Sequence, residues 1–467
     1  MPASDPLRFP YRNELRLPVI GLEAEFKVFV DDVEIIPEDY WQAPAAFIDR
    51  PLLRRGRKAS QLPTGGAVYF DGGVLEVVTP VIEITTQCTA RAVRSLWEQI
   101  GFVRGQLDRW EARSGKRVRL QGFSCHFNIS YELAREQRNR DRTIQKLALL
   151  LAHLLPVPAI VAGANRASTG VGVRPRRERL EVTFDFTPDP GLMAATTAAI
   201  VGIVRDVITW PSYRLEELDA RGIPAIADLN PGRHPTRKGW IARAFHFPRD
   251  PFAGRVDAQV WTMRDGSTLS LRQLALEIAT HFRNSIRAYS DPFSYRILFS
   301  LLRGEIPSLL DLDARPPAYD DIGRAVQWGT ILPELHNYAE AMHDEDGAVV
   351  RRRSSDVEEK LAPPWRGEGT DRRAHVTLPP HVQRRAAPDR RALSPTTSPR
   401  LARSNYERVF LRLGSGKPLK IGREVLTPVG VKGWYHAVFR NQRGDERMLS
   451  IDQVLDAMSI SASSIRL

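Results

Sequence analysis

Two glutamates one residue apart, Glu23 and Glu25, lie in a stretch from Gly21 to Val30 that has the composition of a β-strand. Side chains of a strand alternate between its two faces, so an extended stretch would place both carboxylates side by side. Adjacent carboxylates repel each other unless positive charge lies between them, and hard cations such as Mg²⁺ take oxygen ligands. The pair therefore predicts half of a metal site; the alternative is a strand face that carries two acids into solvent.

A further glutamate, Glu76, occurs in the segment from Ala67 to Pro80, which is typical of two strands joined by an Asp71-Gly72 turn. In the second of these strands, Glu76 shares its face with the apolar Val74 and Val78. A buried carboxylate without a partner costs free energy, so Glu76 is a candidate metal ligand. An acidic strand face that meets solvent is again the alternative.

The segment from Val118 to Ser130 is the next predicted strand, and its alternation places three polar side chains on one face: His126, Asn128 and Ser130. Such a row suits contacts with nucleotide phosphates, a metal ion or a substrate. The alternative for His126 is a structural histidine without a ligand.

Arginines are concentrated in a glycine-containing loop predicted from Ala164 to Arg177, which holds Arg174, Arg176 and Arg177. The loop lacks the Gly-x-x-x-x-Gly-Lys-[Ser/Thr] pattern of phosphate-cradling loops. Guanidinium groups bind phosphate through two parallel hydrogen bonds, so the loop predicts a nucleotide site made of arginines. A strand follows, and one of its faces carries Arg179, Glu181, Thr183 and Asp185.

Two further basic loops have an open role. Residues 51–64 include Arg54, Arg55, Arg57 and Lys58, and residues 230–239 include His234, Arg237 and Lys238. Loops of this kind usually face solvent, and the alternative is that they approach a bound anion.

These segments predict an α+β fold with a curved, mainly antiparallel sheet, an acidic concave face and helices on the other face. The helices are expected at residues 89–114, 144–155, 191–210, 269–288, 292–302 and 323–342, and a short strand at 240–247.

The order of the motifs resembles the carboxylate–amine ligase superfamily, which includes glutamine synthetase and glutamate–cysteine ligase, and within it the amidoligase branch. The motifs are Gly-x-Glu-x-Glu-Phe (21–26), Asp-Gly (71–72), Glu-Val-Val-Thr-Pro (76–80), Cys-His-x-Asn-x-Ser (125–130) and an arginine-rich loop before Glu-Val-Thr (181–183). The resemblance spans residues 19–190 and implies a sheet like that of the glutamine synthetase catalytic domain.

The resemblance also implies a chemistry: ATP and Mg²⁺ would drive formation of an amide or isopeptide bond through an acyl phosphate. The implied carboxylate substrate is glutamate or a peptide carboxylate, and its partner is an amine. The implied metal ligands are Glu23, Glu25, Glu76, His126 and Glu181, which with Arg179 form the implied catalytic set. The residues that the resemblance implies as nucleotide contacts are Asn128, Ser130, Arg174, Arg176 and Arg177.

One position departs from the family pattern. Thr183 stands where the family often has an arginine two residues after the last metal-binding glutamate. Arg179 lies two residues before Glu181 on the same predicted strand face, and it is the candidate replacement.

Three regions are expected along the 467 residues: a catalytic domain (1–343), a disordered linker rich in Pro, Arg and Ser (344–404), and a small β-rich module (405–467). In the module, strands are expected at 406–413, 424–427, 433–440 and 447–451, and a helix at 451–458. Trp434, Tyr435 and Phe439 would form its core or a surface for a protein partner.

The formal charge of +12 adds an alternative function. The basic linker could bind nucleic acid while the sheet serves as an inactive scaffold. A guanidino phosphotransferase on a related sheet is a third candidate. The two cysteines and the polar first 18 residues favour a cytoplasmic protein without a membrane anchor.

Overall fold

The computed structural model describes residues 15–463 except 56–58, 134–136, 138, 165–167, 188, 235–237, 259, 313–402 and 422–423. The predicted helix at 323–342 lies outside the described residues. So does the predicted linker, apart from its last two residues.

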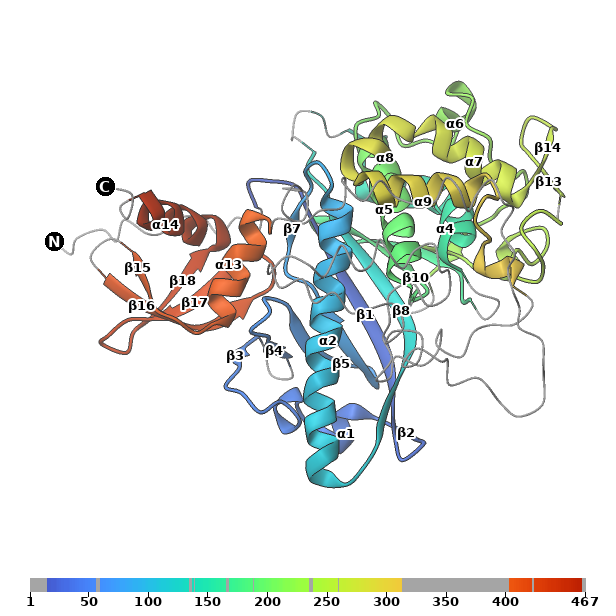
Figure 1. The fold of residues 1–467 in the computed structure, drawn as a ribbon. Helices are drawn as coiled ribbons and strands as arrows, with labels where there is room; N and C mark the ends of the chain where they lie inside the picture. The colour runs from blue at the N-terminus through green and yellow to red at the C-terminus, as the bar shows by residue number, and fades with distance from the viewer. Residues whose placement is uncertain are drawn as a thin grey trace.

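The described residues form a 16-stranded sheet and a separate two-stranded sheet (Figure 1). The strands are β1 Val19–Val30, β2 Val33–Ile35, β3 Leu53–Arg54, β4 Ala59–Gln61, β5 Ala67–Asp71, β6 Val74–Val78, β7 Ile82–Glu83, β8 Val118–Ser130, β9 Val171–Pro175, β10 Arg179–Phe184, β11 Gly232–Arg233, β12 Trp240–Ala242, β13 Val260–Thr262, β14 Thr268–Ser270, β15 Leu419–Ile421, β16 Glu424–Lys432, β17 His436–Arg440 and β18 Glu446–Ser450. The helices of the same residues are α1 Pro37–Trp41, α2 Cys88–Ser114, α3 Ile144–Leu154, α4 Pro156–Gly163, α5 Pro190–Ile208, α6 Glu216–Ala220, α7 Leu271–His281, α8 Arg283–Tyr289, α9 Pro292–Leu302, α13 Asn405–Gly414 and α14 Ile451–Ser463.

The large sheet follows the path β11-β12-β9-β10-β8-β1-β6-β5-β4-β3-β16-β17-β18. Among the described strands, every pairing is antiparallel except that of β16 with β3. The predicted α+β class with a mainly antiparallel sheet is therefore confirmed. The long strands β1 and β8 lie at its centre.

Two tight turns fix the registers of the central strands. Asp31 and Asp32 have φ values of 49° and 66°, and Gly72 and Gly73 have values of 62° and 92°. Two successive positive φ angles define a turn whose twist matches that of a hairpin. The first turn joins β1 to β2, and the second joins β5 to β6 next to the predicted Asp71-Gly72 turn.

One face of the central strands packs against helices. Leu22, Ala24 and Phe26 of β1 are fully buried, and Phe26 contacts Phe186 edge-on at 5.1 Å between ring centroids. Trp97 of α2 stacks on Phe186, with 5.6 Å between ring centroids. Strand alternation directs the acids of β1 to the opposite face, away from α2.

The helix layer is extended by α5, which packs against α2, α4, α8 and α9 (Figure 1). By length and composition α5 could cross a membrane, as could α3 together with α4, which meet at a 50° bend. The protein interior buries 89% of the apolar window of α5. Such burial is typical of a core helix.

Several sequence-based boundaries are wrong. The helix expected at 269–288 divides into the end of β14, α7 and α8, and the strand expected at 240–247 ends at Ala242, before a 3₁₀ turn. The arginine loop contains strand β9, so Arg174 lies in the sheet. The capping box formed by Ser270 and Gln273, three positions apart, explains why a helix begins at Leu271.

The C-terminal module consists of strands β15 to β18 with α13 and α14 (Figure 1). The strand expected at 406–413 is wrong, because α13 occupies these residues. Tyr406, Val409, Phe410 and Leu413 are buried at helical spacing. Three later strands and a helix are present as expected, but with different bounds: β16 extends to Lys432, β17 begins only at His436, and α14 extends to Ser463. Trp434 lies in the turn between β16 and β17.

Candidate functional site

Strand register brings the predicted acids together. Glu25 lies opposite Glu76 in the pairing of β1 with β6, and Glu23 lies opposite His126 in the pairing of β1 with β8. Residues directly opposite each other on neighbouring antiparallel strands project from the same face. Three strands that are distant in sequence therefore present these side chains to one place.

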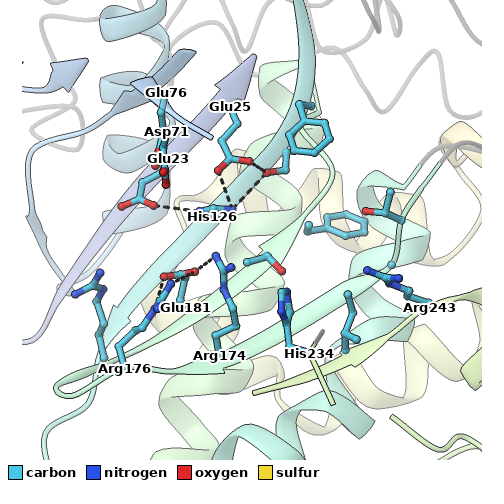
Figure 2. Close-up of a pocket in the computed structure, with 18 of the residues that line it drawn as sticks. Glu23, Glu25, Asp71, Glu76, His126, Arg174, Arg176, Glu181, His234 and Arg243 are labelled. Carbon is cyan, nitrogen blue, oxygen red and sulfur yellow. Dashed lines mark hydrogen bonds and ion pairs between the residues drawn. The ribbon is translucent and has the colours of Figure 1, made fainter. Parts of the chain in front are cut away.

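Glu23, Glu76 and His126 form a compact cluster in which one ligand atom of each lies within 4.8 Å of the others. His126 Nδ1 lies 3.1 Å from Glu23 Oε2, and His126 Nε2 lies 3.5 Å from Glu25 Oε1 (Figure 2). Ser124, opposite Glu25, donates a hydrogen bond to Glu25 Oε2. The cluster is thus a candidate metal centre with Glu25 beside it.

The electrostatics of the cluster fit a cation. Burial and the negative charges of Glu23 and Glu25 raise the pKa of Glu76. Burial acts in the same direction on the pKa of Glu23, but hydrogen bonding and charge from His126 outweigh it and lower that pKa. Tyr69 OH donates to Glu76 Oε1 at 2.6 Å. Buried carboxylates that repel one another, together with an imidazole, form a donor set suited to a divalent metal ion.

Glu181 has different surroundings from the other predicted ligands. Arg176 donates from Nε and Nη2 to its two carboxylate oxygens at 2.7 and 3.0 Å, and Arg174 forms an ion pair with the same group (Figure 2). The side chains of Glu181 and Arg174 are 3% and 7% exposed. Glu181 is therefore neutralised by two guanidinium groups and is not part of the compact three-residue cluster found among the described residues.

Of the remaining predicted site residues, catalytic Arg179 lines the cavity and the nucleotide contacts Asn128, Ser130 and Arg177 do not. Arg179 lines the cavity and donates from Nε to Asn128 Oδ1 at 2.7 Å. Ser130 accepts from the Val19 amide, and the 84%-exposed side chain of Arg177 lies near Glu178. Of the described residues lining the cavity, none is Asn128, Ser130 or Arg177.

The cluster and the arginines face one cavity of about 390 Å³. Acids gather at one side of it around His126, while Arg174 and Arg176 lie across from them (Figure 2). This division gives a place for a cation beside a place for anionic groups.

Several lining residues were missed by the sequence reasoning: Tyr69, Asp71, Phe123, Ser124, Thr169 and Arg243. Tyr69 is opposite Glu76 in the β5–β6 hairpin, so the hairpin register could have indicated it. Phe123 could not be found by alternation, because the register of β8 against β1 shifts at this point. A β-bulge of this kind redirects a side chain, and Phe123 is 49% exposed.

The two basic loops also reach the site. Arg55 is the residue after β3. Burial lowers the pKa of its guanidinium group, and the negative charges of Tyr69, Glu23 and Glu76 act in the opposite direction. Its guanidinium group therefore lies within electrostatic reach of the acids. From the second loop, His234 lines the cavity, and Arg237 lies outside the described residues.

Thr183, at the position where the resemblance implies an arginine, lies opposite His126 in the pairing of β10 with β8 and lines the cavity. Arg179 is two residues earlier on β10 and lines the same cavity. The alternation expected for this strand is thus confirmed, and a guanidinium group is present beside the site from a different position.

No family model and no curated protein matches the chain. Among solved structures, the chain is similar to the ligase PafA in complex with the prokaryotic ubiquitin-like protein Pup, with 11% identity and a TM-score of 0.40 over 95% of this chain and 93% of that one. The Pup ligase PafA in complex with ADP gives 10% identity and a TM-score of 0.35 over 85% and 89%. Because these scores are low, the function is argued from the residues of the site.

Proposed function

We propose that the protein is an ATP-dependent carboxylate–amine ligase that forms an amide or isopeptide bond through an acyl phosphate. The observation that carries the proposal is the charge division of one cavity. Glu23, Glu76 and His126 form a metal-type cluster on one side, and arginines of β9 and β10 lie on the other. The motifs that resemble the ligase superfamily lie on the same strands and contain the residues of this cluster.

In the proposed reaction, a substrate carboxylate oxygen attacks the γ-phosphorus of ATP and ADP leaves. An amine then attacks the acyl carbon, the phosphate leaves, and the amine loses a proton as the amide forms. Phosphoryl transfer depends mainly on positioning and on neutralising negative charge. Arg174, Arg176 and Arg179 are the side chains that would neutralise the transferred group.

Glu23, Glu76 and His126, with Glu25 beside them, would hold Mg²⁺. When bound, Mg²⁺ neutralises phosphate charge and fixes the orientation of the phosphates. The role of the chain is to keep these carboxylates in one register and to shield them from bulk water. Glu181, held by two arginines, would orient the phosphate-binding guanidinium groups, although the family resemblance implies a metal ligand here.

The test is a screen for phosphate release from ATP and Mg²⁺ with pools of amino acids, peptides and amines, followed by mass spectrometry of the adduct. The wild type is expected to release phosphate only when a carboxylate and an amine are both present. The double variant E23Q/E25Q should lose this turnover. The matched control is E34Q, because Glu34 of β2 is exposed and pairs with Lys27.

The screen also separates the alternatives. A phosphorylated guanidino compound in place of an amide would identify a guanidino phosphotransferase. Binding of DNA or RNA that weakens steeply with salt and is unchanged in E23Q/E25Q, without ATP turnover, would favour a nucleic-acid-binding scaffold. Absence of ATP turnover with every pool would refute the ligase proposal.

A further inference from the structure

The turn between β16 and β17 brings the C-terminal module into contact with strands β1 and β10, next to the cavity. Trp434 lies in this turn and is 8% exposed. The guanidinium carbon of Arg179 lies over its ring, 4.9 Å from the centroid. A guanidinium group within about 6 Å of an indole face is attracted to the π-electrons of the ring. A residue of the module thus contacts an arginine that lines the cavity.

A second contact involves Gly21, in the middle of the Gly-x-Glu-x-Glu motif. A Cβ atom at this position would lie 3.1 Å from Trp434 Cζ2, closer than nearly all real Cβ contacts. Gly21 lies within β1, so the strand backbone alone does not demand a glycine there. The absence of a side chain instead lets the indole ring approach the strand that carries Glu23.

Arg179 is held from two directions. Its Nε donates to Oδ1 of the fully buried Asn128 at 2.7 Å, and its guanidinium carbon lies over the indole ring of Trp434. A guanidinium group held by a hydrogen bond and by an aromatic ring keeps few rotamers. Arg179 is also part of the cavity lining.

The body of the module is anchored to the same sheet. Gly430 of β16 pairs with Arg54 of β3, and a Cβ atom on Gly430 would lie 2.9 Å from the Arg54 carbonyl oxygen. Arg94 of α2 and Glu407 of α13 form an ion pair at 3.0 Å, with side chains 1% and 0% exposed. The turn that carries Trp434 is thus part of a firmly packed unit.

We propose that Trp434 is a positioning residue that fixes Arg179 toward an anionic ligand, so that the C-terminal module completes the site. The sequence had assigned the module only a core or a partner surface at this residue. The inference rests on the proposed function, in which the ligand is the phosphate chain of ATP. It assigns the motif glycine a reason as well, because Gly21 makes room for the indole.

The test compares full-length variants by calorimetric titration with ATP and Mg²⁺ and by KM and kcat for ATP. Leucine at position 434 keeps an apolar side chain but removes the π-face, so W434L should weaken ATP binding about tenfold, the loss expected for a cation–π contact that is only partly shielded from water. W434F retains an aromatic face and should stay within about threefold of the wild type. The control is F439L, because Phe439 is fully buried in the module and lies outside the cavity lining among the described residues.

A double-mutant cycle shows whether Trp434 acts through Arg179. R179A should weaken ATP binding, and W434L/R179A should weaken it no further. Additive losses, an unchanged ATP affinity in W434L, or an equal loss in F439L would overturn the positioning role while leaving the ligase proposal intact. If the wild type binds no ATP, both proposals fail. G21A tests the same contact from the opposite side without altering the module, and it should reproduce the loss seen in W434L.

Discussion

Glu76 and Glu181 were both predicted to bind metal, but their surroundings differ. Replacing each by glutamine should therefore have opposite effects on metal-free stability and on stabilisation by metal. Glu76 faces other carboxylates, and two carboxylates whose oxygens lie within 4.8 Å of each other repel by at least about 3 kcal/mol at an effective dielectric constant of 20. Its raised pKa indicates that without metal it is protonated at neutral pH. E76Q replaces a neutral acid by a neutral amide of the same shape, so metal-free stability should change by less than about 1 kcal/mol.

Glu181, in contrast, faces the guanidinium groups of Arg174 and Arg176 in a buried setting. E181Q removes the negative charge that balances them, and loss of one partner of a buried ion pair costs about 3–5 kcal/mol. A Mg²⁺ ion held by Glu23, Glu76 and His126 should stabilise the wild type by about 2.7 kcal/mol at a concentration 100 times its Kd. E181Q should keep this gain and E76Q should lose it.

The assay is fluorescence-monitored thermal unfolding of the three proteins in EDTA and in saturating Mg²⁺. In EDTA, E76Q should melt close to the wild type and E181Q several degrees lower. The shift produced by Mg²⁺ should be present in the wild type and E181Q only. If E181Q instead melts like the wild type and loses the Mg²⁺ shift, Glu181 is a metal ligand and the reasoning from the ion pairs is refuted.

Three further outcomes follow from buried groups outside the cluster. E407Q removes the buried carboxylate that pairs with Arg94 at 3.0 Å and should lower stability by about 3–5 kcal/mol, measured by denaturant unfolding; an unchanged midpoint would contradict this. Burial raises the pKa of Asp189 to about 6, above its ordinary value of 3.8, so its ionisation should cost about 3 kcal/mol of stability as pH rises from 4 to 6. D189N retains a capping acceptor and should lack that fall in a pH series of melting curves. G66A would place a Cβ atom 2.2 Å from the Val78 carbonyl oxygen, so a loss of about 3 kcal/mol is expected, and a stability equal to that of the wild type would show that the loop can move.

Strand periodicity is a local property, so alternation was enough to predict that Glu23 and Glu25 share one face of their strand. That Glu76 and His126 meet this pair depends on strand register, and it was expected only from the concave sheet and the family resemblance. The environment of Glu181 was not predictable in the same way. This environment depends on β9, which places Arg174 opposite Glu181. The sequence predicted a loop at these residues. Ion pairing between strands follows from register, and register is set by the whole sheet.

The wrong prediction of a strand at residues 406–413 of the C-terminal module has a different origin. Tyr406, Val409 and Phe410 are aromatic or β-branched, and this favoured a strand in the sequence. The capping box of Ser404 with Glu407 and the burial of one helical face override that propensity. The contact of Trp434 with Arg179 joins residues more than 200 positions apart, so no local pattern could have indicated it.

The parallel pairing of β3 with β16 bears on how the chain folds during synthesis. Until the ribosome has released residues beyond Gly430, the edge of β3 has no partner, and Val19 and Val81 lack the module residues that complete their apolar cluster. An unpaired edge beside apolar side chains invites pairing with other chains. We therefore expect the nascent protein to be most prone to aggregation after β1 to β12 have emerged from the ribosome and before β16 to β18 have followed.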